Sequence, residues 1–345
     1  MTREVEQEAV RAGDELLRWS RAIVDPVLRN AVGRFPRALE DVAQYHFGWC
    51  DEDGAPRVAP GGKAIRPAFA LLAAEAVGGD AAAAAPAAAA VELVHNFSLL
   101  HDDVMDGDAT RRHRPTAWTV FGTNAAILTG DALLIAASDM LSSSGHPGAL
   151  DAVRLLGAGM LELLEGQSAD LAFERRDDVT PAECLAMVEG KTAALLGAAC
   201  ALGGLFGGAD THHRTALREF GRLVGIAFQH VDDMLGIWGD PAVTGKPVHA
   251  DLRAGKKSLP VVAALNSATT AGDELAALYR RRPLSGDELV RAADLVEAAG
   301  GREWSRTQAD ALLERAVERL HSAALNPRAL TELAVLARLA TRRDH

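Results

Sequence analysis

Apolar residues recur along most of this chain at the spacing of amphipathic helices. Between residues 4 and 32 they are interleaved with charges in a way that fits a helix better than strand alternation. The same pattern predicts further helices over residues 68–77, 86–106, 119–142, 148–171, 180–205 and 211–233, and again between 269 and 345. Strand patterns are nearly absent. The chain is therefore expected to be all-α, an array of roughly a dozen helices.

One helical stretch is long and apolar enough to cross a membrane. From Thr192 to Ala209 the chain runs eighteen residues without a charge, although five of these residues are glycines. A helix that is apolar on every side is either a membrane span or the centre of a large helical protein. No other stretch resembles a span, so we expect a buried helix and no membrane span.

Composition narrows the class of protein. A chain of 345 residues with 48% hydrophobic content is long enough for one large domain or two, with a sizeable core. The net charge of −11 argues against nucleic acid as a main partner, because phosphate backbones are bound by basic faces. Three widely spaced cysteines and a charged N-terminus without an apolar signal core predict a reduced, cytoplasmic protein.

The stretch LLHDDVMDGDATRRHRPT gathers acidic and basic groups at the end of a predicted helix. Asp102 and Asp106 stand one turn apart and Asp103 lies on the adjoining edge, so all three are expected to face one way. Oxygen ligands without a cysteine or histidine partner suit a hard ion such as Mg²⁺, which uses few carboxylates plus substrate phosphate oxygens. Arg111 and Arg112 then supply a phosphate clamp. The alternative is a solvated, mixed-charge helix end.

A second acidic cluster repeats this theme about 130 residues later. Asp232 and Asp233 close a predicted helix, but position 236, where a third carboxylate one turn later would complete the pattern, is a glycine. Lysines follow in a loop rich in glycine and proline, at Lys246, Lys256 and Lys257. Each of these charged groups alone could be ordinary solvent-exposed surface charge. Two acid pairs that are both followed by basic residues predict a binding site for metal and anions.

Three smaller signals accompany these clusters. Lys63 and Arg66 stand three residues apart in the loop GGKAIRP, just before a predicted helix start. His95 shares a helix face with the first aspartates, although a histidine satisfied within the core is the alternative. Gly190-Lys191-Thr192 imitates the end of a nucleotide-binding loop, but the leading glycine and the preceding strand of that motif are missing.

These motifs together resemble the trans-isoprenyl diphosphate synthases, or polyprenyl synthetases, and most of all the bacterial short-chain geranylgeranyl diphosphate synthases. GGKAIRP, HNFSLLHDDVMDGDATRRHRPT, EGQSADL, MVEGKT, FQHVDDMLGIWGDPAVTGKP and DLRAGKKSLP fall in the family's order, between about residues 60 and 262. The resemblance implies a single domain over residues 1–345, built as a helical bundle around a central apolar cavity. It also implies a homodimer that condenses isopentenyl diphosphate head to tail with an allylic diphosphate, with three Mg²⁺ ions bound with diphosphate.

The resemblance also assigns roles to individual residues. The metal ligands and catalytic carboxylates are Asp102, Asp103, Asp106, Asp232 and Asp233, supported by Gln167 and Asp170. The allylic diphosphate is held by Arg111, Lys191, Lys246 and Lys256, of which Lys191 also counts as catalytic. Isopentenyl diphosphate is bound by Lys63, Arg66, His95 and Arg112. Thr192 and Gln229 line the reacting region.

Two residues depart from the family pattern. Relatives often have aspartate where this chain has Gly236, and they usually have glycine where it has His113. A class I terpene cyclase is a poorer match because no NDxxSxxxE motif is present, and head-to-head coupling enzymes lack GGKxxRP. A non-catalytic partner subunit of a prenyl synthase is the alternative from another class. Such subunits usually lose part of an aspartate cluster.

Product length is expected to depend on Phe97 and Ser98. Phe97 lies five residues before Asp102, about 7.5 Å deeper along the helix. In the resembling family a bulky aromatic at that depth acts as a floor under the growing tail, and a second aromatic beside it shortens the product. Ser98 leaves that second place open, which favours C20 geranylgeranyl diphosphate. Farnesyl and longer products remain alternatives, as does a Phe97 that is ordinary core packing.

Overall fold

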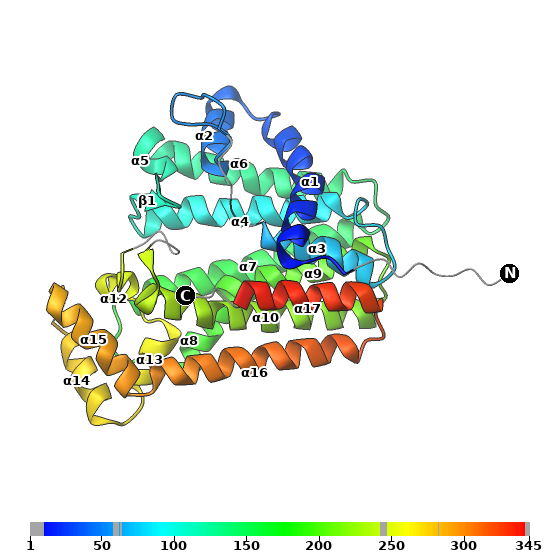
Figure 1. The fold of residues 1–345 in the computed structure, drawn as a ribbon. Helices are drawn as coiled ribbons and strands as arrows, with labels where there is room; N and C mark the ends of the chain where they lie inside the picture. Colours follow the sequence, from blue (N-terminus) through cyan, green and yellow to red (C-terminus); the bar gives the residue numbers. More distant parts are fainter. Residues whose placement is uncertain (1–9, 58–61, 63, 242–246, 282, 342–345) are drawn as a thin grey trace.

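Helices form almost every regular element of the structure, a computed structural model that describes residues 10–57, 62, 64–241, 247–281 and 283–341 (Figure 1). The helices of the first half are α1 (Gly13–Val32), α2 (Arg37–Phe47), α3 (Ile65–Ala76), α4 (Ala85–Met105), α5 (Ala117–Phe121), α6 (Thr123–Ser142) and α7 (Ala149–Phe173). Those of the second half are α8 (Pro181–Val188), the π-helix η1 (Glu189–Ala193), α9 (Ala194–Phe206), α10 (Thr211–Trp238), α12 (Ala250–Ala254), α13 (Leu259–Leu265), α14 (Thr270–Tyr279), α15 (Gly286–Ala298), α16 (Gly301–His321) and α17 (Pro327–Thr341). The expected all-α fold is confirmed.

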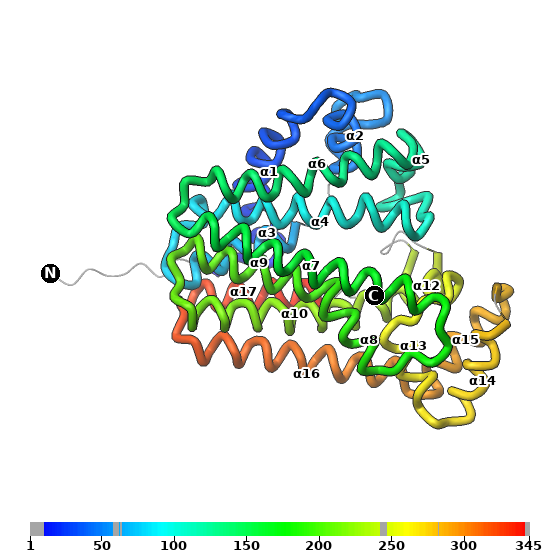
Figure 2. The backbone as a smooth tube through the Cα atoms, turned by 180° about the vertical axis from the view of Figure 1, so that it is seen from behind, coloured from blue at the N-terminus to red at the C-terminus, as the bar shows by residue number. Residues whose placement is uncertain are grey.

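The helices pack in two layers that Figures 1 and 2 show from opposite sides. One layer holds α1, α2 and the long pair α4 and α6, while the other is built around α10, which packs on α9 and α16. α3 joins the layers because it contacts both α4 and α9. The largest core cluster lies around α4, and a second one lies between α3, α10, α16 and α17.

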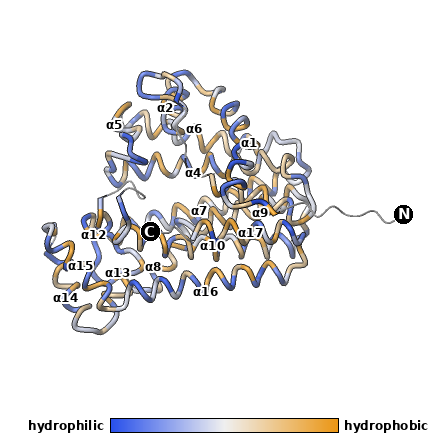
Figure 3. The backbone as a smooth tube through the Cα atoms, viewed as in Figure 1, coloured by the Kyte–Doolittle hydropathy of each residue, from blue (hydrophilic) through white to orange (hydrophobic). Residues whose placement is uncertain are grey.

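The apolar stretch around α9 lies in the interior. Every residue of α9 is buried, and 72% of the most apolar window of Pro181–Phe206 is buried, which fits the expected core helix. Thr123–Ser142 also passes a length and composition test for a membrane span, but only 33% of its window is buried. α16 is an example of an amphipathic helix, because hydrophilic and hydrophobic colours alternate along it in Figure 3. α6 therefore presents an apolar face, with Leu128 and Ile135, that none of the described residues covers.

Several elements differ from the sequence expectation, among them α2, α12 and α13, which the pattern did not predict. The helix predicted over 119–142 is divided by Gly122, whose φ of +88° ends α5 and starts α6. α10 continues to Trp238, so Asp232 and Asp233 lie inside the helix and not at its end. The only strands among the described residues form one small antiparallel hairpin, β1 (Thr110–Arg111) and β2 (Arg114–Pro115), directly after the first acid pair.

The two ends of the described chain are joined by a partly buried ion cluster. The Arg11 guanidinium donates to Glu332 Oε2 at 2.6 Å and to Glu75 Oε2 at 2.5 Å. The Glu332 side chain is fully buried, so this carboxylate depends on its donors for compensation. The cluster therefore fixes α17 and α3 to the segment that leads into α1.

Candidate active site

Both acid pairs lie at one end of the bundle and face each other. The first pair lies in the last turn of α4, next to the β1–β2 hairpin, and Figures 1 and 2 both place that hairpin and α12 at the same end. Lys256, which follows α12, lies within electrostatic reach of Asp232 and Asp233 and also of Asp106. Its ammonium group therefore lies between the two clusters.

The sequence predicted that the three aspartates of the first cluster face one way, but Asp103 differs from the other two. Asp103 is only 1% exposed, and its Oδ1 accepts a hydrogen bond of 2.7 Å from Arg111 Nε and forms an ion pair with Nη2, also at 2.7 Å. Its other oxygen is buried and has no hydrogen-bond partner among the described residues. Asp102 and Asp106 instead lie within electrostatic reach of Lys191 and Asp170. The first cluster thus has two partly exposed carboxylates, and a third that holds an arginine.

Lys191 lies opposite these two carboxylates, on the π-helical turn η1. Its Nζ is 2.5 Å from Asp170 Oδ2, so the expected support from Asp170 takes the form of an ion pair. Burial raises the pKa of Asp102 to about 6, against the opposing effect of Lys191. Single π-turns of this kind are frequent at functional sites. Gln167, one turn before Asp170 on α7, is 4% exposed, and in the part of the chain that the structure describes neither of its amide atoms has a hydrogen-bond partner.

In the second cluster Asp233 has the role that Asp103 has in the first. It is 2% exposed, and its two oxygens accept hydrogen bonds from Gln229 Nε2 at 2.7 Å and from the Leu259 N–H at 2.8 Å. Burial raises its pKa to about 7. Thr192 donates in turn to Gln229 Oε1 at 2.7 Å, which links η1 to the cluster. Asp232 is less buried than its neighbour.

We call the region of Asp102, Asp106, Asp170 and Asp232, with Lys191 and Lys256, the acid site. Of the lysines expected to reach it, Lys246 lies outside the described residues. Lys257 turns away, because its Nζ lies 3.7 Å from Asp177 Oδ1 and 5.1 Å from the ring centroid of Tyr279.

A separate basic pocket lies along α4, on the other side of the hairpin. Arg66 Nη1 is 3.2 Å from His95 Nε2, and the Arg112 guanidinium lies within electrostatic reach of the buried Glu92, as does that of Arg66. A Cβ at Gly62 would lie 2.5 Å from Arg112 Nη2, so the glycine leaves room for this guanidinium. We call this group of Arg66, His95, Arg112 and Glu92 the basic pocket. Lys63 lies outside the described residues.

A cavity of about 290 Å³ adjoins the basic pocket and adds a residue that sequence reasoning missed. Arg21 of α1 lines it together with Arg112 and Glu92, and its Nη2 donates to the Gly62 carbonyl at 2.8 Å. Asn96 supports Glu92 by donating to its Oε1 at 3.2 Å. Arg21 lies 42 residues before Lys63, and no local motif marks it. Glu92 lies one turn before His95 on α4, and no motif in the sequence distinguishes it.

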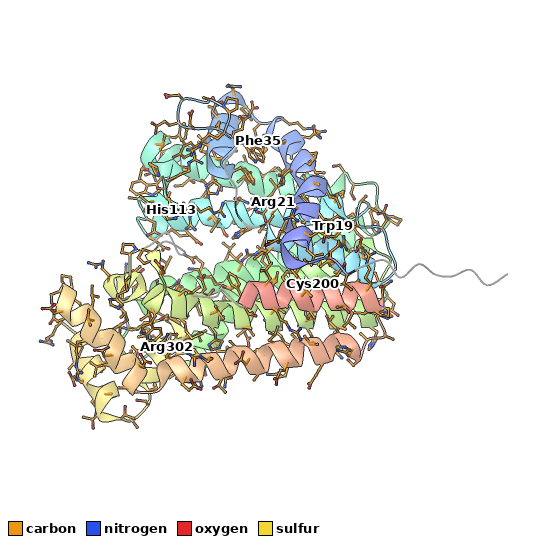
Figure 4. All side chains as sticks on the ribbon, in the orientation of Figure 1. Trp19, Arg21, Phe35, His113, Cys200 and Arg302 are labelled. Atoms are coloured by element: carbon orange, nitrogen blue, oxygen red, sulfur yellow. The ribbon has the colours of Figure 1, made fainter. Side chains whose placement is uncertain are left out.

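The hairpin explains why the family usually has glycine at the position of His113. Arg112 and His113 are its two turn residues, and both have positive φ, +52° and +60°. Two-residue turns of this kind need positive φ at both positions, which glycine adopts without strain. His113 therefore occupies a conformation that favours glycine. Figure 4 labels it at the hairpin end of the layer that also holds Arg21.

Phe97 and Ser98 lie deeper along α4. Phe97 is 5% exposed within the largest core cluster, and its ring lies edge-on to His101 at 4.7 Å between centroids. The Ser98 hydroxyl donates to the His95 carbonyl at 2.9 Å. Ser98 thus satisfies its own hydroxyl within the helix and adds no bulk beside Phe97.

The donor set of the acid site fits a hard divalent ion. Among the described residues, no three histidine, cysteine, aspartate or glutamate side chains converge on one point. Mg²⁺ does not need such a cage, since it is held by one or two carboxylates, water and substrate phosphates. Asp102 and Asp106 on one side and Asp232 on the other provide carboxylates of this kind. The three cysteines are buried and free, far from metal-ligand spacing.

Comparison with known proteins agrees with this geometry. The family model described as polyprenyl synthetase matches residues 49–296. A geranylgeranyl diphosphate synthase of Mycobacterium tuberculosis is 46% identical over 334 residues, covering 96% of this chain and 94% of that protein. A (2E,6E)-farnesyl diphosphate synthase of the same organism is 44% identical over 326 residues, covering 93% and 91%. The chain is thus similar to relatives with two different products.

Solved structures give the same result. A polyprenyl synthetase from Streptomyces coelicolor A3(2) superposes with a TM-score of 0.91 at 45% identity, covering 95% of this chain and 99% of that one. A geranylgeranyl pyrophosphate synthase from Corynebacterium glutamicum, in complex with isoprenyl diphosphate and magnesium, reaches 0.83 at 26% identity and covers 97% and 100%. The family match, the all-α bundle and the two facing acid pairs lead to one conclusion: this chain belongs to the polyprenyl synthetases and is an isoprenyl diphosphate synthase.

Proposed function

We propose that this enzyme is a Mg²⁺-dependent geranylgeranyl diphosphate synthase, which adds isopentenyl diphosphate head to tail to an allylic diphosphate. The observation that carries the proposal is the pairing of two unlike sites along α4. The acid site offers carboxylates and two lysines, whereas the basic pocket offers guanidinium groups and a neutral histidine. One site suits a diphosphate bound with metal, and the other suits a diphosphate bound by protein cations alone.

At the acid site the bond to be broken is the allylic C–O bond. Bound Mg²⁺ stabilises the negative charge that develops on the departing diphosphate. Asp102 and Asp106 from α4 and Asp232 from α10 would hold the ions, while Lys191 and Lys256 neutralise diphosphate oxygens. Asp103 and Asp233 are already held by protein donors. We therefore assign Asp103 to the positioning of Arg111, and Asp233 to the positioning of Gln229.

At the basic pocket Arg66 and Arg112 would bind the diphosphate of isopentenyl diphosphate with charge-assisted hydrogen bonds. Burial and the neighbouring arginine lower the pKa of His95 well below its usual value, so the ring is neutral and acts as a hydrogen-bond partner. Lys63 belongs to this set by the family pattern. Arg21, which donates to the Gly62 carbonyl, would position the loop that carries Lys63.

The C20 product rests on Phe97. Its ring lies in the core of the layer below the first acid pair, and Ser98 leaves the neighbouring place small. The similar proteins of Mycobacterium tuberculosis include both a farnesyl and a geranylgeranyl diphosphate synthase. The C20 product of this chain is therefore proposed from Phe97 and Ser98.

We further propose a cytoplasmic homodimer in which each chain forms one domain over residues 1–345. α6 and the adjoining α7 expose apolar side chains, among them Leu128 at 56%, Ile135 at 70% and Leu161 at 70%. A second copy brings an identical apolar face, and a two-fold axis pairs the faces. Leu128→Glu should shift the sedimentation of the protein toward monomer. Val290→Glu, at an exposed site on α15, is the matched control.

Product analysis tests the function directly. The purified protein is incubated with Mg²⁺, isopentenyl diphosphate and each allylic diphosphate in turn, and the chain length is measured. Wild type should stop at C20, Phe97→Ala should give longer products and Ser98→Phe should give C15. An unchanged length in both variants places the floor elsewhere. No condensation with any allylic substrate contradicts the enzyme assignment and favours a partner subunit.

A further inference from the structure

The imidazole of His101 on α4 lies directly against the ring of Phe97, one turn earlier on the same helix. The two ring centroids are 4.7 Å apart and the rings meet edge-on, at an interplanar angle of 62°. Aromatic rings prefer this arrangement, so each ring limits the orientations of the other. The side chain on which product length is proposed to depend is therefore packed against a histidine that the proposed chemistry does not use.

Helix α6 holds this imidazole from the other side. α4 and α6 lie side by side in Figures 1 and 2 and pack against each other. His101 Nε2 is 3.0 Å from the Ile127 carbonyl oxygen, and because a carbonyl can only accept, Nε2 carries the proton and donates. The same nitrogen lies 3.8 Å from Asp131 Oδ1, one turn later on α6. These contacts fix the direction in which the imidazole points.

Gly130 of α6 provides the space that the imidazole needs. This glycine is buried, and a Cβ added to it would overlap Nε2 and Cδ2 of His101. Glycine is less favourable than alanine inside a helix, so its presence here calls for a reason. The close approach of the imidazole to the α6 backbone supplies that reason. Gly130 thus sets how far His101 reaches between the two helices.

The direction of His101 separates it from the acid site. Asp102, the next residue, lies within electrostatic reach of Lys191 across the bundle, whereas His101 faces α6. Phe97 is 5% exposed in the core cluster around α4, and its neighbour Ser98 is too small to hold its ring. The space between α4 and α6 that the imidazole fills is consequently the place into which the Phe97 ring would turn if the imidazole were absent.

We propose that His101 is a positioning residue for product length, which keeps the Phe97 ring under the growing tail and out of the space between α4 and α6. The inference rests on the proposed function, in which Phe97 is the floor of the tail cavity. Without the imidazole, the Phe97 ring turns toward α6 and the cavity becomes deeper. The enzyme then releases products longer than C20, although every residue that binds substrate or metal is still present.

Two variants of His101 test the proposal. His101→Ala removes the imidazole, and His101→Gln removes the ring while keeping an N–H that can donate to the Ile127 carbonyl. Both should raise the ratio of longer products to C20 by about tenfold, the discrimination that one or two methylene groups provide in an apolar pocket. Gly130→Ala keeps His101 but displaces its ring, and should act in the same direction. Product analysis measures the ratio, and thermal unfolding measures the Tm.

His146→Ala is the matched control, because the His146 ring stacks on Phe206 with 4.3 Å between centroids, beyond the far end of α6. It should lower the Tm as His101→Ala does and leave the product at C20. The double variant Phe97→Ala/His101→Ala should give the same products as Phe97→Ala alone, since His101 acts through Phe97.

The outcomes separate this role from a structural one and from the proposed function. If both His101 variants stop at C20 while Phe97→Ala gives longer products, the assignment of His101 is wrong. Equal lengthening in His146→Ala would mean that a looser core, and not His101, changes the product. A double variant with longer products than Phe97→Ala would show that His101 does not act through Phe97. If Phe97→Ala itself stops at C20, the floor in the proposed function is wrong, and the role of His101 falls with it.

Discussion

The acid site and the basic pocket are neighbours on α4, yet they meet an anion in opposite ways. The acid site gathers carboxylates and repels a diphosphate until cations are added, whereas the basic pocket carries its positive charge in the protein. Each site receives one of the two adjacent arginines of the hairpin. Arg111 donates to Asp103 at the acid site, and Arg112 lies by Gly62 and Glu92 at the basic pocket. Metal dependence should therefore belong to one substrate.

The largest expected effect separates the two aspartates of the first pair. Asp102→Ala removes a partly exposed carboxylate of the acid site and should lower turnover by about a hundred- to thousandfold. Asp103→Asn only loosens Arg111 and should cost about tenfold. Steady-state kinetics at saturating Mg²⁺ measure both, and circular dichroism checks the fold. Equal losses in the two variants would erase the distinction between a ligand and a positioning residue. Activity that persists in EDTA would remove the metal from the mechanism.

The next effect concerns the basic pocket. Arg66→Ala and Arg112→Ala each remove charge-assisted contacts and should raise the KM for isopentenyl diphosphate about tenfold or more, with little change in the KM for the allylic substrate. Lys191→Ala on the acid side should do the reverse. Each substrate is titrated separately at saturation of the other. If all three variants affect both substrates alike, the two sites are not distinct.

A smaller effect concerns the loss of folding stability at acid pH, which we expect to depend on His46 of α2. Burial, with the charges of Arg112 and Arg111, lowers the pKa of His46 to about 3. The unfolded chain binds a proton near pH 6.5 and the folded one does not, so stability is lost as pH falls below 6.5, by about 1.4 kcal/mol per unit. Urea unfolding of wild type and His46→Gln between pH 7 and 5 should show a flatter decline for the variant. Parallel declines would mean that His46 is protonated in the folded state.

The smallest effect lies in the hairpin between the sites. His113→Gly relieves a positive φ of +60° and should stabilise the protein by about 1 kcal/mol. His113→Ala keeps the strain and serves as the control, with no gain expected. Thermal unfolding measures both variants. A gain for alanine equal to that for glycine would point to the side chain and not to the backbone.

Much of the fold followed from local pattern. Helical periodicity predicted the long helices, because a helix repeats its apolar face every three to four residues, but it did not predict α2, α12 or α13. The end of α10 was placed too early because acidic residues look like a boundary, although the helix continues beneath them to Trp238. The break at Gly122 was missed because the flanking residues keep the helical period.

The candidate site was predictable only where its residues are close in sequence. Asp102, Asp106 and Asp232 stand out in short motifs, and the structure brings them to one end of the bundle. Arg21 has no such motif, since it reaches the site through packing between distant elements. Sequence spacing also failed to separate Asp102 from Asp103, because it gives no information on which carboxylate meets an arginine.

Under the proposed function, the β1–β2 hairpin separates the two reactants. Its adjacent arginines turn to opposite sides, Arg111 to Asp103 and Arg112 to Gly62, so two extended side chains from one turn would hold the two anionic head groups apart. The carbon atoms that join are attached to those head groups by short tethers, and their approach depends on this spacing. Lengthening the turn by one residue would change the reach of every substrate pair at once, without altering any group that binds them.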